Sequence, residues 1–387
     1  MTGAGRRRAK VLQFAATWGG GLATHVATLA QRLDRSKYDV HVLCPEKGEL
    51  RQRLQALGLR FDTISVQSEM DAWGDFQMAR RVLRYLGEHQ FDLVHAHSTK
   101  AGFWGRGAAW VSRVPVVLYT PHAYRFLRYP VGSPLWAGYV VLEWLGGRAG
   151  TGVIAVGPSE GRLTRRLHLA PKRRQFVVNN GVPMVSAPQA RDPRVRGRLG
   201  LPERCPLVLT VGRFMRQKDP LAFVEVAAAI GCRNGSVEFV MVGEGELEPA
   251  VRRRAVKLGI AERLHIVPRT DEMAALLLET DVFVMTSRYE GLSYSGAEAA
   301  AAGRALVFSD VPGLRDLVDS GRTGFLVQPG DVAGFAAQIL RLLADAQLRG
   351  RVGAAAAQFV AEHFGIERMI RDTESVYSAL LAERGRA

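Results

Sequence analysis

Hydrophobic and polar positions follow a regular rhythm along the chain, with short apolar runs separated by longer amphipathic stretches. Runs such as Val11–Ala16 and Val116–Thr120 have the length and composition of buried strands, and the periodic stretch 22–33 predicts a helix. Strands that alternate with helices of roughly 10–15 residues indicate βαβ units, in which helices cover both faces of a parallel sheet. The sequence therefore predicts an α/β fold.

The rhythm stops at Pro183–Pro206, which is rich in proline and arginine and predicted to be a linker, and then it restarts. Two Rossmann-like domains in tandem are expected, over residues 1–185 and 186–366. The last stretch, 367–387, is predicted to form a helix that packs back towards the first domain. Doubly wound sheets bind ligands at the carboxyl ends of their strands, so we expect the two domains to face across a cleft that holds the chemistry.

Composition excludes several classes of protein. The 387 residues are 47% hydrophobic and 23% charged, which is typical of a globular chain and not of a disordered or collagen-like one. No apolar run reaches the roughly 18 residues of a membrane-spanning helix. The sequence has only three cysteines, far apart: Cys44, Cys205 and Cys232. Neither a disulfide framework nor a cysteine zinc site is therefore expected, and a cytoplasmic location is the default.

The positive charge is unevenly distributed. Residues 1–200 contain 30 lysines and arginines against 13 acidic residues, whereas 201–387 contain 22 against 24. The basic first half should attract an anionic partner such as phospholipid headgroups, nucleic acid or a phosphorylated substrate, unless the excess charge is only a solvated face.

Two carboxylates mark the strongest candidate site in the second half. Glu290 and Glu298 follow a predicted strand and open a helix, and their eight-residue spacing separates them by about 80° and about 12 Å along a helix. Glu290 is therefore expected in the loop and Glu298 inside the helix, as two contacts on one elongated ligand. Free N–H groups at Gly291, Leu292 and Ser293 would bind an anion between them. An acidic cap plus a surface glutamate fits the same spacing.

A basic pair follows the first predicted strand of the second half. Arg213 can donate in a fork and Lys218 supplies a point charge, and phosphates bind at this position in doubly wound folds. The pair is predicted to hold a diphosphate, with a basic surface turn as the alternative.

The first half has weaker candidates. A glycine turn that includes Gly20 and Gly21 lies between the first strand and helix, where backbone can approach a ligand closely. Two predicted strands end near histidines. His95 and His97 lie at the end of one strand, and His122 lies at the end of the next. Buried, hydrogen-bonded histidines are the ordinary alternative, and the strand-end position favours a role for His122.

In this order the motifs resemble the retaining glycosyltransferases of family 4, which have the GT-B fold. The resemblance covers almost the whole chain and rests on these segments: Gly20-Gly21…His25-Val26, His95-Ala-His97-Ser98, Tyr119-Thr-Pro-His122, Asn180-Gly181-Val182, Gly212-Arg213…Lys218, Glu290…Glu298 and Pro312-Gly313…Gly324-Phe-Leu-Val.

The resemblance implies roles for these residues. Arg213 and Lys218 would hold the diphosphate of the donor, Glu290 would contact the transferred sugar, and Glu298 the ribose hydroxyls. His122 would face the reacting sugar. The backbone of Gly20 and Gly21 would approach the donor and the acceptor. The nucleobase would lie beside Pro268, Arg269 and Thr270.

The implied activity is transfer of a hexose from a nucleotide-sugar to a hydroxyl group, with retention at the anomeric carbon. The nucleotide-sugar, linked to UDP or GDP, is a co-substrate, and no cofactor is expected. No metal is expected either, because Arg213, Lys218 and the helix N-terminus would stabilise the charge on the leaving diphosphate. A double displacement and a same-face route both remain open.

The acceptor is expected on the basic first half. Residues 123–147 mix aromatic and basic side chains, a combination that suits a membrane interface. We therefore expect peripheral docking on the anionic inner face of the cell membrane and a lipid-linked or saccharide acceptor, for a capsule or exopolysaccharide. The alternative is that the aromatic residues form an ordinary core: Tyr124, Phe126, Tyr129, Trp136 and Trp144, beside Arg125 and Arg128.

Three other classes of protein fit parts of the sequence. Ser159 lies in Gly157-Pro-Ser-Glu-Gly161, which fits the G-x-S-x-G pattern of serine hydrolases, but no histidine is well placed to serve it. A nucleic-acid binder fits the charge but lacks a recognised motif, so no nucleic-acid partner is expected. An inactive binding module is disfavoured because both glutamates and both cations of the motif are present.

Overall fold

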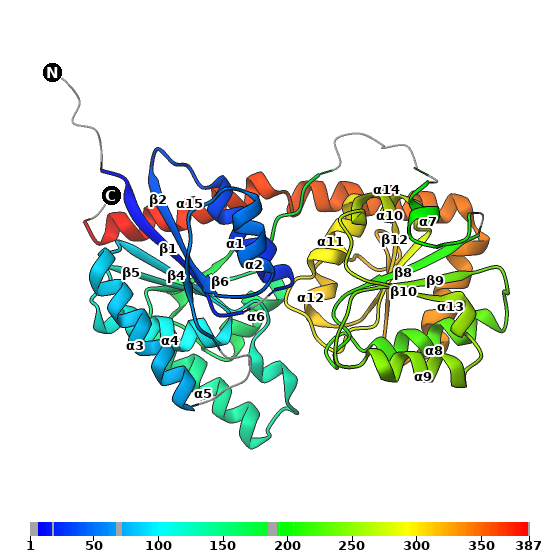
Figure 1. Cartoon of the computed structure of the whole chain (residues 1–387), viewed down its shortest axis with the longest axis horizontal. Helices are drawn as coiled ribbons and strands as arrows, with labels where there is room; N and C mark the ends of the chain where they lie inside the picture. The colour runs from blue at the N-terminus through cyan, green and yellow to red at the C-terminus, as the bar shows by residue number, and fades with distance from the viewer. Residues whose placement is uncertain are drawn as a thin grey trace. The chain divides into compact units, whose positions relative to one another are not determined.

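The computed structural model describes residues 7–17, 19–66, 72–184, 192, 194–203 and 205–385. The chain divides into two compact units (Figure 1). The first unit comprises Met1–Gly181 and Ile366–Ala387, and the second comprises Val182–Gly365. The predicted boundary at 185/186 lies outside the described residues.

The first unit is built on a seven-stranded parallel sheet with the order β3-β2-β1-β4-β5-β6-β7. Order reverses between β1 and β4, which makes their carboxyl ends the switch point where doubly wound sheets bind ligands. The strands are β1 (Ala9–Ala15), β2 (Tyr38–Pro45), β3 (Asp62–Ile64), β4 (Leu93–His97), β5 (Val116–Thr120), β6 (Gly152–Ala155) and β7 (Gln175–Val177).

Helices cover both faces of this sheet because neighbouring side chains on each strand point to opposite faces. Val11 and Ala15 of β1 pack with α1 and α15, whereas Leu12 and Phe14 pack with α3 and α4. The helices are α1 (Gly21–Arg32), α2 (Glu49–Ala56), α3 (Ala72–His89), α4 (Ser98–Val111), α5 (Pro134–Ala149), α6 (Pro158–Arg166) and α15 (Ile366–Glu383), with short 3-10 turns η1 (Arg125–Arg128) and η2 (Lys172–Arg174).

The final helix, α15, belongs to the first unit although the second unit precedes it in the sequence (Figure 1). Its apolar face packs in the same core as α1, and Tyr377 is fully buried there. The hydroxyl of Tyr377 takes part in hydrogen bonds with β1 and β4, so a residue near the end of the chain reaches the switch point.

The second unit has a six-stranded parallel sheet with the order β10-β9-β8-β11-β12-β13, and its switch point lies between β8 and β11. The strands are β8 (Leu207–Val211), β9 (Glu238–Val242), β10 (Leu264–Val267), β11 (Val282–Met285), β12 (Ala305–Ser309) and β13 (Phe325–Val327). The helices are α7 (Arg194–Arg198), α8 (Pro220–Gly231), α9 (Glu248–Lys257), α10 (Met273–Glu279), α11 (Tyr294–Ala301), α12 (Pro312–Arg315), α13 (Val332–Ala344) and α14 (Ala346–His363), with the 3-10 turn η3 (Ala261–Arg263).

The predicted linker Pro183–Pro206 contains a short helix that was not predicted, because Arg194–Arg198 folds as α7. Residues 185–191, 193 and 204 of that stretch lie outside the described residues. Arg196 of α7 is buried and forms an ion pair of 2.9 Å with the buried Glu279 at the end of α10. The sequence did not predict this helix, because its local composition is rich in proline and arginine and does not reveal that Arg196 has a partner far along the chain.

Candidate functional site

The switch point of the second unit contains a small hollow at the carboxyl ends of β8 and β11. Both cations of the predicted diphosphate site line it, together with residues that follow β11 and the start of α8. The lining residues are Thr210, Val211, Gly212, Arg213, Phe214, Lys218, Pro220, Met241, Met285, Thr286 and Ser287.

Two glycines of the turn after β9 pack against the loop that lines this hollow. Gly243 and Gly245 have φ angles of +144° and +156°, and a Cβ at either would collide with the backbone of Gly212 or Phe214. Phe214 donates its N–H to the Glu244 carbonyl over 2.9 Å, and Gly212 donates to Val242 over 3.0 Å. Close backbone contact, which only glycine allows, therefore fixes the loop that carries Arg213.

Lys218 and Glu290, which are 72 residues apart in the sequence, meet in this site. The Nζ of Lys218 lies 2.6 Å from Oε1 of Glu290, and Gln217 Nε2 donates to the other carboxylate oxygen over 3.3 Å. An ammonium group has three donors, so Lys218 retains donors for a ligand. The structure thus brings one predicted diphosphate contact and the predicted sugar contact together.

The loop that carries Lys218 is fastened to the end of β11. The hydroxyl of Thr286 donates to the Asp219 carbonyl over 3.0 Å, and Nε of Arg288 donates to the Asp219 carboxylate over 2.7 Å. Asp219 has a left-handed φ of 48°, after which Pro220 starts α8. A strained residue held by several contacts is typical of a binding loop.

Two polar groups at the hollow have no partner among the described residues. The guanidinium of Arg213 is exposed and has no hydrogen bond or ion pair to any residue that the structure describes. The hydroxyl of Ser287 is buried and also lacks a partner among those residues. A buried unpartnered hydroxyl costs free energy, so a ligand acceptor at this point would be favoured. Ser287 was not predicted as a site residue, although it is the second residue after β11.

Helix α11 begins at the end of the loop that follows β11. Ser293 caps this helix and accepts the N–H of Gly296 over 3.2 Å. Gly291 packs so closely on Gly313 that a Cβ there would collide with the Gly291 carbonyl. Leu292 is buried, and Glu298 is part-buried inside α11.

The three residues predicted to contact the nucleobase follow β10. Pro268 and Arg269 are exposed and Thr270 is part-buried, with its hydroxyl accepting the N–H of Glu272 over 3.1 Å. None of the three lines the hollow.

In the first unit, the glycine turn and His122 both lie at the switch-point edge of the sheet. Gly20, with a φ of +82°, precedes α1, and Gly21 is its first residue. The N–H of Gly20 donates to Oε2 of Glu49 over 2.8 Å. Trp18, which precedes these glycines in the sequence, lies outside the described residues.

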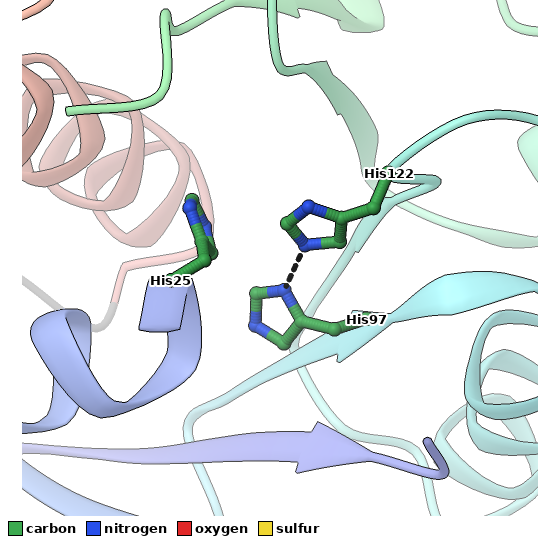
Figure 2. A group of neighbouring side chains, drawn as sticks. All are labelled: His25, His97 and His122. Atoms are coloured by element: carbon green, nitrogen blue, oxygen red, sulfur yellow. Dashed lines mark hydrogen bonds between the residues drawn. The ribbon is translucent and has the colours of Figure 1, made fainter. Parts of the chain in front are cut away.

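Four imidazoles gather near these glycines. Nδ1 of His97 lies 3.2 Å from Nε2 of His122, and the ring of His25 packs edge-on against both, with centroid distances of 5.4 and 4.6 Å (Figure 2). His95 stacks at a tilt beside His97, with ring centroids 4.1 Å apart.

A buried chain of hydrogen bonds connects His95 and His97 to residues of β1, β5 and α15. Gln13 donates to the Tyr377 hydroxyl over 2.9 Å, and its Oε1 lies 2.8 Å from Nε2 of His97. His95 lies 2.6 Å from the Tyr377 hydroxyl and 2.8 Å from that of Thr120. Sequence reasoning missed Gln13 and Tyr377. A buried amide in the middle of an apolar strand was the available signal for Gln13.

Burial keeps all four histidines neutral at pH 7. It lowers the pKa of His25 to about 4, against a partial opposing effect of its hydrogen bond with Asn180. Burial also lowers the pKa of His95, His97 and His122 well below the ordinary value, and the neighbouring imidazoles lower it further.

The aromatic stretch 123–147 does not form a continuous interface, which corrects part of the prediction. Tyr124 and Phe126 are each only 1% exposed, because they fill a core between β5 and α6. The solvent face of α5 is nevertheless apolar, with Arg148 as its only charged residue. The large exposed side chains on that face are Leu135, Val141, Trp144 and Leu145. No helix of the described chain is long and apolar enough to cross a bilayer.

The serine of the hydrolase motif is buried at the start of α6. Its hydroxyl accepts a hydrogen bond of 2.6 Å from Arg162. The neighbouring Glu160 also has a structural role, since its carboxylate accepts the N–H groups of Ala123 and Val156.

Models of two glycosyltransferase families match the two units. A model described as Glycosyltransferase Family 4 matches residues 19–184, and one described as Glycosyl transferases group 1 matches residues 205–345. The chain is 28% identical over 320 residues to the UDP-Gal:alpha-D-GlcNAc-diphosphoundecaprenol alpha-1,3-galactosyltransferase of Escherichia coli, which covers 81% of this chain and 82% of that protein. It is 30% identical over 312 residues to the alpha-maltose-1-phosphate synthase of Mycolicibacterium smegmatis, covering 75% and 79%.

Solved structures of low sequence identity have the same fold. Anabaena Alr3699/HepE in complex with UDP and glucose matches with a TM-score of 0.83 at 19% identity, covering 96% of this chain and all of that one. WaaG, a glycosyltransferase involved in lipopolysaccharide biosynthesis, matches with a TM-score of 0.74 at 15% identity, covering 95% and 99%.

Proposed function

Because the chain belongs to glycosyltransferase family 4 and has the GT-B fold, we propose that it transfers a hexose from a UDP-sugar to a lipid-linked saccharide, with retention at the anomeric carbon. The observation that carries the proposal is the meeting of Arg213, Lys218 and the Lys218–Glu290 ion pair at the switch point of the second unit. This arrangement offers two cations to a diphosphate and a carboxylate to the sugar attached to it.

The chemistry follows from charge development. Breaking the bond between the anomeric carbon and the diphosphate leaves negative charge on the phosphate oxygens, and preorganised cations stabilise that charge. Arg213 and Lys218 supply them, assisted by N–H groups at Gly291–Ser293. Glu298 binds the ribose hydroxyls, and the exposed turn 268–270 contacts the base. This donor site needs no metal ion, so transfer is expected to survive excess EDTA.

The first unit holds the acceptor in this proposal. Its net positive charge and the apolar face of α5 favour docking on an anionic membrane, where a lipid-linked saccharide resides. The named acceptor of the Escherichia coli relative is a sugar diphosphoundecaprenol, which supports a polyprenyl-linked acceptor and a place in surface polysaccharide synthesis. His122 hydrogen-bonds the transferred sugar, and Gly20–Gly21 approach the donor and acceptor.

The test is release of nucleoside diphosphate from a panel of UDP- and GDP-sugars, with and without polyprenyl-diphosphate saccharides, in EDTA. We expect acceptor-dependent turnover with one UDP-hexose and a product of the same anomeric configuration by NMR. Inversion of configuration, or turnover with no donor in the panel, would refute the assignment. The serine hydrolase alternative is not supported by any relative named above, and Ser159→Ala is expected to leave transfer unchanged.

A further inference from the structure

Three histidines from separate elements of the first unit converge on one point (Figure 2). His25 comes from α1, His97 ends β4, and His122 lies in the loop after β5. One ring nitrogen from each lies within 4.8 Å of the other two. Side chains so far apart in sequence meet only because the sheet places the ends of β1, β4 and β5 side by side.

The spacing is close to that of a metal shell. Zinc binds imidazole nitrogen at about 2.0–2.1 Å, so two ligands of a tetrahedral site lie roughly 3.3 Å apart. Nδ1 of His97 and Nε2 of His122 are already 3.2 Å apart. The remaining distances, of at most 4.8 Å, close to that value through small rotations of the rings.

The outer contacts of the cluster leave ligand nitrogens facing inwards. Gln13 gives its N–H to Tyr377, so its carbonyl oxygen accepts the Nε2–H of His97. This bond fixes the tautomer of His97 and leaves the lone pair of Nδ1 directed at the cluster, where it accepts the Nε2–H of His122. A metal ion would take the place of that proton, and His122 would then carry its proton on Nδ1. His25 is likewise held by a hydrogen bond with Asn180. Such second contacts commonly orient metal-binding histidines.

Neutral imidazole is the form that acts as a metal ligand. Desolvation lowers the pKa of the buried His25 and His97 and of the part-buried His122, which favours that form. Three neutral nitrogens and no anionic ligand match the protein part of a three-histidine site with an open fourth position.

His122 is also held in place at a conformational cost. His122 and Ala123 both have left-handed φ angles, of 53° and 78°, which are unfavourable for residues other than glycine. The carboxylate of Glu160 maintains this bend by accepting the N–H of Ala123 over 2.8 Å. Strain of this kind persists where a side chain must point in one direction.

We propose that His25, His97 and His122 form a binding site for one divalent cation of the zinc class, and that its occupation inhibits glycosyl transfer. The fourth position would be open to water or a ligand oxygen. The inhibitory part rests on the proposed function, because His122 cannot hydrogen-bond the transferred sugar through a nitrogen that binds metal. This inhibition is compatible with a reaction that proceeds in EDTA.

Binding is tested with Co²⁺ alone on the full chain, by visible absorption and calorimetry. We expect one equivalent to bind with the intense spectrum of four-coordinate Co²⁺ and to be displaced by Zn²⁺. His122→Asn keeps a residue that tolerates the left-handed backbone and should weaken binding more than about tenfold. His168→Gln, which removes an exposed histidine outside the cluster, should change nothing.

Several results would overturn the site: no binding by the wild type, a weak six-coordinate spectrum, or equal affinity in His122→Asn. If that variant does not fold, as judged by circular dichroism, His25→Asn makes the same comparison. Inhibition is then tested by adding Zn²⁺ to the transfer assay. Wild type should lose activity at one equivalent, whereas the rate of His25→Asn, whatever its value without metal, should not change when Zn²⁺ is added. Equal inhibition of both, or Zn²⁺ binding without inhibition, would refute the inhibitory role. Absence of any transfer would refute the proposed function and leave the cobalt result standing.

Discussion

The two units share one topology and use their switch points in opposite ways. The second unit places charged side chains there, with Arg213 exposed and Lys218 paired with Glu290. The first unit places buried neutral groups there, a set of histidines linked by Gln13 and Tyr377. One doubly wound scaffold can therefore present either a charged anion site or a neutral polar cluster, depending on the residues that follow β1, β4, β8 and β11.

The largest effect is expected from removing charge at the second switch point. Lys218→Ala and Glu290→Ala should each lower the rate of transfer by about 10³-fold, because charge stabilisation of this kind is worth several kcal/mol. Steady-state release of UDP measures it. Arg252→Ala, which removes an exposed arginine paired with Glu248, is the matched control and should retain full activity. Near-normal turnover in either site variant would contradict the assignment.

Each unit also has a buried ion pair, which allows their stabilities to be compared. Arg106–Glu143 spans 3.0 Å in the first unit, and Arg196–Glu279 spans 2.9 Å in the second. Removing one partner leaves a buried charge, so Glu143→Ala and Glu279→Ala should each cost about 3 kcal/mol or more.

Tryptophan fluorescence distinguishes the two units in this experiment, because all six tryptophans lie between residues 18 and 144. The denaturant concentration at the midpoint of unfolding, followed by tryptophan fluorescence, should fall for Glu143→Ala. For Glu279→Ala, the rate of amide hydrogen exchange in the second unit should rise. A change below about 1 kcal/mol, the value expected for an exposed pair, would show that the pair is not desolvated.

Acid should destabilise the first unit through its histidines. Their native pKa values lie below the ordinary 6.5, to about 4 for His25, so the unfolded state binds more protons between those values. The free energy of unfolding therefore falls as pH is lowered from about 6.5 towards 4, by up to about 1.4 kcal/mol per pH unit for each such histidine. His25→Gln should reduce that slope, and His265→Gln in the second unit should not. A free energy of unfolding that does not change over this pH range would mean that the histidine cluster is solvated.

The smallest effect concerns the apolar face of α5. Val141 and Val256 are both exposed valines on helices, one in each unit, at 54% and 69%. Val141→Asp should lower sedimentation with anionic vesicles about tenfold, because it places a charge on the face proposed to enter the membrane. Val256→Asp makes the same change in net charge and should have little effect. Equal losses in both variants, or equal binding to neutral and anionic vesicles, would exclude docking through α5.

Strand-end positions let the sequence predict which residues of the second unit lie together, while the roles of those residues stay predictions. Arg213, Lys218 and Glu290 each follow a strand, and parallel strands bring their carboxyl ends together whatever their sequence separation. The hydrogen-bond chain behind the histidines could not be predicted in the same way, because His95 is hydrogen-bonded to Tyr377, which lies 282 residues later in the sequence on α15. Local composition misled twice, since Arg196 has a distant partner and Tyr124 and Phe126 are core residues.

If the second unit binds the donor diphosphate through Arg213 and Lys218, UDP should protect that part of the chain in hydrogen–deuterium exchange of the full-length protein. We expect slower exchange in Gly212–Asp219 and in the segment from Arg288 to Ser295 when UDP is present, with the protection lost in Lys218→Ala. Protection confined to the first unit, or unchanged in that variant, would contradict it.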